Sequence, residues 1–487
     1  MSNGPDYPHL GTRIGRWLGP VLALAWWTTA GADMPHDAGV VLALAIWMAV
    51  WWMTEALPLS VTSLLPLIVL PTFSSLGFNA TAAPYASSIV FLFMGGFMLG
   101  LALQHSGLHR RIALAVLVRA GSGQRRLVGG FMLVTALLSM WLSNTATAMI
   151  VMPIGLSVIA ACREAQDDEP PGGRAFDPFA AAIVLGIGYA ASIGGMGTPI
   201  GTPPNLIMTG YLRSHYGVDV SMLEWMRVAV PVLLILLPAT WAWLCLVSLR
   251  VPRGAAASTS GDVLRARLAE LGPITPAERR VGIVFATVAA CWVLRPQLVA
   301  WTGLTGLDDA VIALVGAMAL FILPAGRGRG RGERLLDWHT AQYLPWDILL
   351  LFGGGLSLAA AISASGADAP LTAMLSGFGA VPVVTIILLL AVVIVFSGEL
   401  TSNTAAATAI MPVLAALCTA RGLDLLPVFM VATLASSCGF MLPVATPPNA
   451  IAFGTGMVPM RRMMRAGLGV NLIGVAVIVG YVWLVAF

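Results

Sequence analysis

The sequence predicts an all-α polytopic membrane protein with about 11 transmembrane helices and two re-entrant helical hairpins in an inverted repeat. Of the 487 residues, 58% are hydrophobic and only 10% are charged, whereas a soluble protein carries about 25% charged residues. Uncharged apolar stretches of about 20 residues recur along the chain, and each can cross a bilayer as a helix. A transmembrane barrel would instead show short segments of alternating polarity.

The N-terminal part of the chain predicts four spans and one helix at the membrane surface. Three spans are expected at about 17–31, 38–54 and 87–105, and between the last two the chain breaks and restarts around Pro58 to give a span that ends near Pro71. Residues 109–126 follow, with apolar residues at helical spacing and five Arg around them. This pattern suits a helix that lies in the membrane interface.

The stretch 127–161 carries no charge, and Arg flanks both of its ends. A single helix of that length would be about 52 Å long, well beyond the ~30 Å of a hydrocarbon core, and two full spans would need roughly 40 residues plus a turn. We therefore expect a re-entrant hairpin with Ser143–Thr145 at its tip. Non-helical backbone at that depth is tolerated where protein buries it or where it lines a wet cavity.

The middle of the chain predicts four more spans. The fifth begins near Phe179 and is interrupted at 197–204, because two consecutive prolines remove two backbone donors and end a helix. The following segments are expected at about 229–249 (sixth span), 250–280 (an Arg-rich cytoplasmic loop), 281–301 (seventh span) and 309–324 (eighth span).

The second half of the chain repeats strings of the first half. Ser402–Thr404 follows Ser143–Thr145 by 259 residues, and FMGGF at 93–97 returns at the same offset as FGGGL at 352–356. Polar, helix-breaking strings at corresponding places of two apolar halves are typical of a transporter's binding site.

A second pair of strings extends the repeat. GTPPN at 201–205 returns as ATPPN at 445–449, with an offset of 244 because a polar insert at 162–178 lengthens the first half. The remaining segments are expected at 367–379 (a short amphipathic stretch), 381–420 (the second hairpin), 443–448 (the break in the tenth span) and 466–487 (the eleventh span).

The Arg residues predict the orientation in the membrane. All 26 basic residues are Arg; with the N-terminus inside, 11 crossings and both hairpins re-entrant, 22 of them lie inside and four outside. This is a strong positive-inside bias. It places the first hairpin entering from the cytoplasm and the second from outside, as an inverted-repeat transporter requires. The outside four are Arg213, Arg227, Arg295 and Arg421.

Each hairpin tip can bind ions through its backbone. One helix C-terminus presents carbonyls that suit a cation, and one helix N-terminus presents amides that suit an anion. Ser, Asn and Thr add hard oxygen ligands that suit Na⁺. No basic residue lies within the tips or breaks, so co-bound cations would offset the charge of a bound anion in a low-dielectric site. Glu399, beside the second tip, is expected to orient that loop.

Other partners and chemistries are not indicated. The Arg residues cluster in loops, where their use is topological, so the formal charge of +4 does not predict nucleic-acid binding. The five Cys are scattered without a CxxC pair, which argues against a metal site or a disulfide framework. The six His are dispersed, and no metal-ligand spacing lies at membrane depth, so an enzyme is not expected.

These strings resemble the divalent anion:sodium symporter family of dicarboxylate, citrate and sulfate carriers. The matching strings are WWMTEALPLSVTSLLP (51–66), the two Ser-Asn-Thr tips, GTPPN and ATPPN, and they extend over nearly the whole chain. The resemblance implies an eleven-span fold with two re-entrant hairpins. It also implies a homodimer and an elevator-type motion of a transport domain against a scaffold.

The resemblance further implies two sodium sites with substrate between the tips. Sodium site 1 corresponds to Ser139, Ser143, Asn144 and Gly201, and sodium site 2 to Gly398, Thr401, Asn403 and Ala445. Substrate contacts correspond to Ser143, Asn144, Thr145, Thr202, Pro203, Ser402, Asn403, Thr404, Thr446 and Pro447. Gly398 departs from the hydroxyl residue expected in sodium-coupled relatives, so a cation there would rely on backbone carbonyls. The second site is then weaker, altered in stoichiometry or differently coupled.

The repeats and the resemblance divide the chain into four blocks. These are N-terminal scaffold helices (1–86), a first repeat core with the broken helix 197–205 (87–228), scaffold helices with the loop 250–280 (229–343), and a second repeat core with the broken helix 443–449 and the last helix (344–487).

We hypothesise a sodium-coupled symporter of the bacterial inner membrane that imports C4-dicarboxylates such as succinate, fumarate or malate. Its N-terminus would be cytoplasmic and its C-terminus outside. The alternatives within this fold are a carrier of sulfate, citrate or another anion, and a sodium-independent anion exchanger. Sulfate carriers of the family often have a large soluble insert, and the longest loop here has only about 30 residues, which favours carboxylates. A channel, the other class, would show conductance without saturation.

Overall fold

The computed structural model describes residues 10–121, 123–164, 176–253, 258–326, 333–367, 369, 372 and 382–486. These residues are almost entirely helical, and strand pairing among them is limited to an isolated bridge between Pro324 and Arg334. The predicted all-α fold is therefore confirmed. The insert 162–178 and the stretch 367–379 lie largely outside the described residues.

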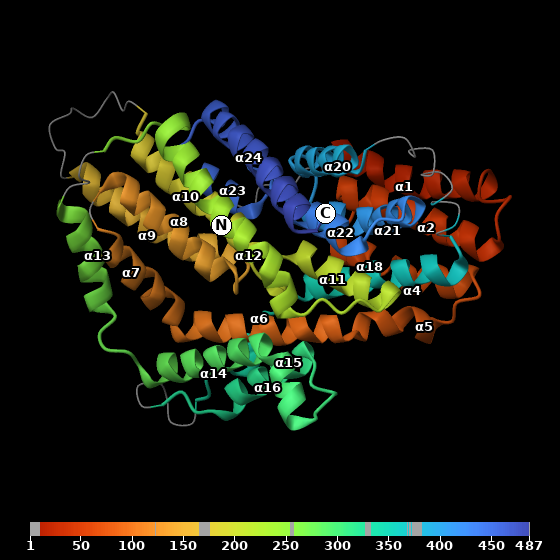
Figure 1. The fold of residues 1–487 in the computed structure, drawn as a ribbon, viewed down its shortest axis with the longest axis horizontal. Coiled ribbons are helices and arrows are strands. Elements are labelled where there is room, and N and C mark those ends of the chain that lie inside the picture. Colours follow the sequence, from red (N-terminus) through yellow and green to blue (C-terminus); the bar gives the residue numbers. More distant parts are fainter. Residues whose placement is uncertain are drawn as a thin grey trace.

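The helices follow the predicted order of spans and hairpins (Figure 1). The first half contains α1 (Leu10–Thr28), α2 (His36–Thr54), α3 (Leu59–Thr62), α4 (Leu65–Phe73), α5 (Phe78–Ala82), the 3₁₀ turn η1 (Ala83–Ala86), α6 (Ser88–Ser106), α7 (Leu108–Ala120), α8 (Gln124–Ser139), α9 (Asn144–Glu164), α10 (Pro178–Gly195), the 3₁₀ turn η2 (Pro199–Gly201), α11 (Pro203–Tyr216), α12 (Met222–Ala242) and the π-helical turn η3 (Trp243–Ser248). The rest of the chain contains α13 (Ser258–Glu270), α14 (Pro276–Val293), α15 (Arg295–Thr302), α16 (Asp309–Ile322), α17 (Trp338–Ala341), α18 (Trp346–Ser365), α20 (Val383–Gly398), α21 (Asn403–Arg421), α22 (Leu425–Ser436), α23 (Pro447–Gly454) and α24 (Met460–Ala486).

The described helices include 8 that are long and apolar enough to cross a membrane, or up to 9 if the bent pair α14 and α15 is one span. Shorter apolar helices occupy Leu59–Phe73, Asp309–Ile322, Val383–Gly398 and Leu425–Ser436. Two of the long helices, α9 and α21, are second arms of the predicted hairpins. The number of crossings therefore stays a prediction.

The predicted seventh span is not a single straight helix. Residues 281–301 bend by 78° where α14 ends and α15 begins. Pro296 lies in the first turn of α15, and a proline there cannot continue the hydrogen bonding of the preceding helix. Arg295 holds the bend in place because its guanidinium pairs with Asp219 at 3.1 Å and with Asp309 at 3.3 Å.

Two surface segments also differ from the prediction. The loop expected at 250–280 contains the helix α13, which packs against α7 and α9. The surface helix expected at 109–126 ends at Ala120, and Gln124 already begins α8. Gly121 separates the two helices with a φ of 82°, a backbone conformation that glycine adopts without a Cβ penalty.

The two halves pack as a pseudo-two-fold pair. Within each half the hairpin lies against the first part of the broken span, α8 and α9 on α10 and α20 and α21 on α22. Between the halves the contacts cross, because α11 packs against α21 and α22 while α23 packs against α9 and α10. The two hairpins lie on opposite sides of the molecule in Figure 1. Every one of these contacts has its counterpart when the halves are exchanged, which is the packing of an inverted repeat.

Repeated residues end and start equivalent helices. The Ser-Gly pair ends both α6 and α18, and Gly107 and Gly366 take the left-handed conformation with φ values of 84° and 71°. Glycine is favoured there because it carries no Cβ. Pro203 and Pro447 begin α11 and α23, where the missing N–H of proline costs no helical hydrogen bond.

The helix α10 lies at the centre of the first half. Every residue from Phe179 to Gly195 is buried. Small residues let neighbouring backbones approach it: a Cβ on Gly188 would lie 3.2 Å from the carbonyl oxygen of Pro448, and one on Gly194 would clash with the backbone of Ala136. Close approach through small residues is how helices associate within a membrane. This helix therefore connects the first hairpin with the second broken span.

Two helices contact both the predicted repeat cores and the predicted scaffold. α6, from the predicted first repeat core, packs against α7 and α11 and also against α14 and α16. α12 packs against α8, α10 and α24 as well as α14, and the predicted boundary at residues 228 and 229 falls inside it. The division into four blocks stays a prediction.

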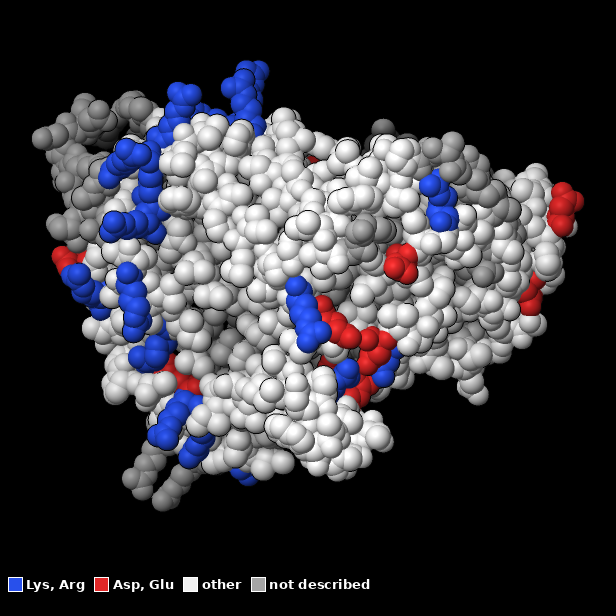
Figure 2. All heavy atoms as spheres, viewed as in Figure 1, with Lys and Arg blue, Asp and Glu red and all other residues white. Residues whose placement is uncertain are grey.

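Arg side chains gather at one end of the face that Figure 2 shows. That end is formed by α7, α13 and the neighbouring ends of α8, α9 and α14, which contact one another through α7 and α13. The Arg residues on these segments are Arg110, Arg111, Arg119, Arg125, Arg126, Arg163, Arg265, Arg267, Arg279 and Arg280. All of them were predicted to lie on the cytoplasmic side.

Candidate functional site

Each predicted hairpin tip is a short non-helical link between two helices. In the first half α8 ends at Ser139 and α9 begins at Asn144. In the second half α20 ends at Gly398 and α21 begins at Asn403. The helix end therefore falls on matched positions of the two repeats, and so does the helix start.

Each broken span is held by the asparagine of its TPPN string. Asn205 Nδ2 donates to the carbonyl oxygens of Gly195 at 3.0 Å and Thr198 at 2.8 Å. Asn449 Nδ2 donates to those of Gly439 at 2.8 Å and Leu442 at 3.1 Å. Both asparagines are fully buried. One side-chain amide thus satisfies the carbonyl at the start of the break and adds a second donor to a carbonyl that also accepts a backbone amide, from Gly201 in the first half and from Ala445 in the second.

The first tip brings several oxygen atoms together. Ser139 Oγ lies 2.7 Å from Asn144 Oδ1 and 2.7 Å from the carbonyl oxygen of Ala191. Gly195 is so close to Asn144 Oδ1 that a Cβ would clash with it, and a Cβ on Gly201 would clash with the carbonyl of Gly195. Ser139 and Asn144 of predicted sodium site 1 therefore contact each other, and Gly195 lies between Asn144 and Gly201. Hydroxyl and carbonyl oxygens at such spacing suit a hard cation.

The second tip has the same backbone but one oxygen fewer. A Cβ on Gly398 would lie 3.0 Å from Asn403 Oδ1, and one on Gly439 would lie 3.2 Å from Cβ of Ala445 and 3.7 Å from the carbonyl oxygen of Gly398. Asn403 Oδ1 is buried without a hydrogen-bond partner. The serine that bonds Asn144 in the first half has no equivalent here, because residue 398 lacks a side chain.

The other predicted hydroxyls have local partners. Ser143 Oγ accepts from the amide of Ala146 at 3.3 Å and caps α9, and Thr446 Oγ1 accepts from the amide of Asn449 at 3.3 Å and caps α23. Thr401 Oγ1 donates to the carbonyl of Ser397, in the last turn of α20, at 3.0 Å, a bond to the residue four positions earlier of the kind common for threonine.

The remaining predicted contacts lie at the helix starts beside the tips and breaks. These residues are Thr145 at the start of α9, Thr202 and Pro203 at the start of α11, Ser402 and Thr404 at the start of α21, and Pro447 at the start of α23. The hydrogen bonds described here connect each tip with the broken span of its own half. The joining of the two tips around one substrate stays a prediction.

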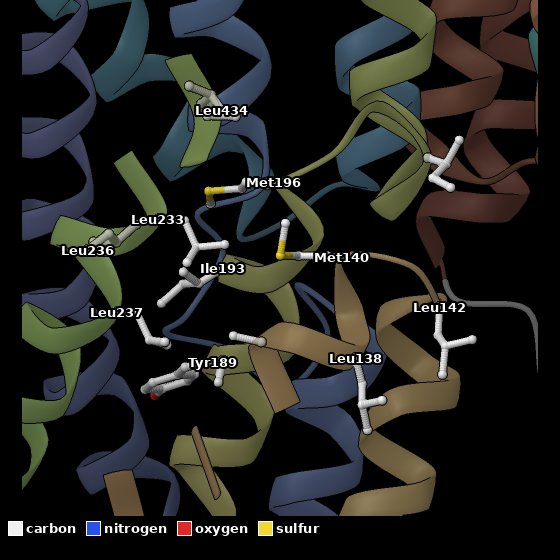
Figure 3. Packing of buried hydrophobic residues seen from close by; sticks show 14 of the residues in the cluster. Leu138, Met140, Leu142, Tyr189, Ile193, Met196, Leu233, Leu236, Leu237 and Leu434 are labelled. Atoms are coloured by element: carbon white, nitrogen blue, oxygen red, sulfur yellow. The ribbon is translucent and has the colours of Figure 1, made fainter. Parts of the chain in front are cut away.

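Apolar side chains surround the first tip. Met140 follows the end of α8 and Met196 follows the end of α10, and Leu233 and Leu236 of α12 lie nearby (Figure 3). A Cβ on Gly197 would lie 3.0 Å from Met140 Cε. These groups cover the buried side of the tip around Ser139, whereas Ser143, Asn144 and Thr145 are partly exposed.

Asn205 and Asn449 were not among the predicted site residues, and Glu399 was predicted only to orient the loop of the second tip. Asn205 and Asn449 belong to strings that the sequence repeats, so the repetition of the asparagine was the available signal. Glu399 is buried with 4% of its surface exposed, and its carboxylate accepts hydrogen bonds from three backbone amides of the second break. It is the one charged residue within the two tips, 139–145 and 398–404.

Comparison with known proteins places the chain in a family. Residues 20–486 match the family model described as the sodium:sulfate symporter transmembrane region. The chain belongs to this family. The resemblance to divalent anion:sodium symporters is thereby confirmed, and the protein is a multi-pass membrane transporter rather than an enzyme.

Curated relatives match over nearly the whole chain. A protein of Staphylococcus saprophyticus named sodium-dependent dicarboxylate transporter SdcS is 40% identical over 480 residues, which are 97% of this chain and 91% of the relative. The SdcS protein of Staphylococcus aureus strain USA300 is 38% identical over 482 residues, with coverage of 98% and 91%.

Two solved structures share the fold. The Alcanivorax borkumensis YdaH transporter aligns with a TM-score of 0.59 at 16% identity, covering 92% of this chain and 98% of that one. Neisseria gonorrhoeae MtrF, described as one of a class of antimetabolite efflux pumps, aligns with a TM-score of 0.59 at 13% identity, covering 95% and 97%.

Proposed function

We propose that this protein is a sodium-coupled symporter that carries C4-dicarboxylates such as succinate, fumarate or malate into the cell. The observation that carries this proposal is the pair of relatives, 38–40% identical over nearly full length, whose names state sodium dependence and dicarboxylate transport. The site supports it chemically. It offers helix N-termini for a carboxylate and oxygen clusters for cations, without a basic side chain in either tip.

The packing supports a division into a transport unit and a scaffold. The transport unit comprises α8–α12 and α20–α24, which carry both tips and both breaks, and the scaffold comprises α1–α6 and α14–α18. We propose that the first unit slides against the second in an elevator-type motion. The seam between them runs where α11 and α21 contact α18 and where α21 contacts α2.

The proposed setting is the bacterial plasma membrane, where the protein would form a homodimer. The Arg-rich end formed by α7, α13 and the ends of α8, α9 and α14 faces the cytoplasm, because positively charged segments are retained on that side. The proposed topology has the N-terminus inside and the C-terminus outside. The staphylococcal relatives support a bacterial membrane.

Uptake into proteoliposomes tests the function. Purified protein is reconstituted, and labelled succinate uptake is measured with an inward sodium gradient, with equal sodium on both sides, and with choline replacing sodium. We expect accumulation above equilibrium only with the gradient. Succinate accumulation that does not depend on the sodium gradient would reject the coupling to sodium. Unlabelled sulfate, citrate and malate added as competitors identify the preferred anion, and strong competition by sulfate alone would reject the dicarboxylate assignment.

A further inference from the structure

The carboxylate of Glu399 occupies a nest of backbone amides. Oε1 accepts from the amides of Phe440 at 2.7 Å and Met441 at 2.8 Å and from Asn471 Nδ2 at 2.7 Å, and Oε2 accepts from the amide of Leu442 at 2.9 Å. Successive backbone amides that converge in this way form an anion-binding concavity. Here the anion belongs to the chain itself.

These bonds connect three elements of the second half. Glu399 follows the last residue of α20, residues 440–442 lie in the break between α22 and α23, and Asn471 lies on α24. The carboxylate thus fastens the hairpin tip to the broken span and to the last helix. No ion pair of the described residues includes Glu399, so dipoles rather than an opposite charge stabilise it.

The first half makes the equivalent connection without a charge. The residue at the place of Glu399 is Met140, whose side chain lies among apolar groups (Figure 3). Its backbone carbonyl accepts a hydrogen bond from Thr198 Oγ1, and Thr198 is the counterpart of Leu442. A hydroxyl therefore fastens the first tip to its break, whereas a carboxylate fastens the second.

Glu399 is connected to the incomplete oxygen cluster through its neighbours in the chain. Gly398 precedes it in the chain, and Gly439 precedes the first amide that it binds. These two glycines lie against Asn403 Oδ1, the oxygen that has no hydrogen-bond partner. Fixing residues 440–442 therefore also fixes the position of Gly439 relative to Gly398 and Asn403.

We infer that Glu399 is a positioning residue for the second cation site and that its charge compensates for the hydroxyl missing at Gly398. This inference rests on the proposed sodium-coupled transport. The carboxylate holds the two loops that supply the oxygen atoms, and its negative charge favours a cation beside it in a low-dielectric environment. The second cation site is thus built from carbonyls and a fixed charge, whereas the first is built from carbonyls and a hydroxyl.

Substitution of the carboxylate by an amide of equal size tests this inference. Glu399→Gln removes the charge, and we expect the sodium concentration for half-maximal succinate uptake to rise roughly fivefold or more, with the succinate KM at saturating sodium little changed. Sodium-dependent thermal stabilisation of the detergent-purified protein, measured without substrate, should shift to higher sodium in parallel. Glu399→Asp keeps the charge and should shift both curves less than Glu399→Gln.

The control is Glu224→Gln, which changes another carboxylate that accepts a backbone amide, that of Ser221 at 2.8 Å at the start of α12. It should leave both sodium curves unchanged. Unchanged sodium curves in Glu399→Gln would overturn the inference, and so would failure of both Glu399 variants to fold, because the residue would then be purely structural. Absence of sodium-driven uptake by the unsubstituted protein would instead reject the proposed function.

Discussion

The two halves of this transporter share one backbone plan and differ in the groups that complete it. Both have a hairpin tip, a break closed by an asparagine, and a helix that starts at two prolines. The chemistry diverges at matched positions: Ser139 corresponds to Gly398 and Met140 to Glu399. Under the proposed function, the repeat sets where ions bind, and single side chains set how strongly each half binds them.

The largest effects are expected where the halves are alike. Asn205→Ala and Asn449→Ala each leave one buried carbonyl without a donor, that of Gly195 or Gly439, at a cost of about 1–3 kcal/mol, and each removes one of two donors from a second carbonyl. Both variants should lose most sodium-driven uptake and melt at lower temperature, which thermal unfolding of the purified protein measures. A large loss in one variant only would show that the two breaks are not equivalent.

An intermediate effect is expected where the halves differ by a hydroxyl. Ser139→Gly removes the hydroxyl that lies 2.7 Å from Asn144 Oδ1, and it should raise the half-activating sodium concentration by up to about tenfold, since a net hydrogen bond contributes about 0.5–1.5 kcal/mol. Gly398→Ser offers a partner to Asn403 Oδ1 and should lower that concentration. The sodium dependence of uptake measures both.

One outcome for Gly398→Ser would contradict this expectation. If Gly398→Ser raises the half-activating sodium concentration, the added side chain crowds Asn403, whose Oδ1 would lie only 3.0 Å from the new Cβ. The hydroxyl would then not be what the second half lacks, and the comparison of the two cation sites would need another basis.

The smallest effect is expected at the far ends of the broken spans. Arg213 on α11 pairs with Asp308 at 2.7 Å, and its counterpart in the second half is Met457. Because the Arg213 side chain is 35% exposed, the pair should contribute at most about 1 kcal/mol. Arg213→Met should lower the melting temperature slightly. A double variant with Asp308→Asn measures the coupling, and additive effects would show that the pair contributes nothing.

The backbone of the site was predictable because its polar and helix-breaking residues interrupt apolar segments. Polar residues and proline pairs within apolar runs cannot continue a helix, so the tips and breaks could be placed from the strings alone. Both tips and the first break lie where they were expected, whereas the second break begins directly after Ser436, before the predicted 443–448. Ser139 and Asn144 contact each other, and the sodium site that the resemblance implied around them stays a prediction.

Features that depend on distant partners were not predictable. The bend between α14 and α15 combines Pro296 with ion pairs from Arg295 to Asp219, which is far away in the sequence. The bonds from Glu399 to residues 440–442 likewise join segments about 40 residues apart. The sequence shows that Glu399 is a charged residue in an apolar region, but only the folded chain shows which backbone amides donate hydrogen bonds to its carboxylate.

The crossed packing of the halves also has a consequence for synthesis. α9 and α10 pack against α23, and α11 packs against α21 and α22, so the first half is made before its partners exist. The start of α21 follows the start of α9 by 259 residues, which takes roughly 10–50 s at a ribosome that adds about 5–20 residues each second. During that interval the faces of α9 and α11 contact lipid or a chaperone in place of the later helices. The small residues on α10 suit close contacts with the later helices better than contacts with lipid chains, which favours docking of the second half once it is made.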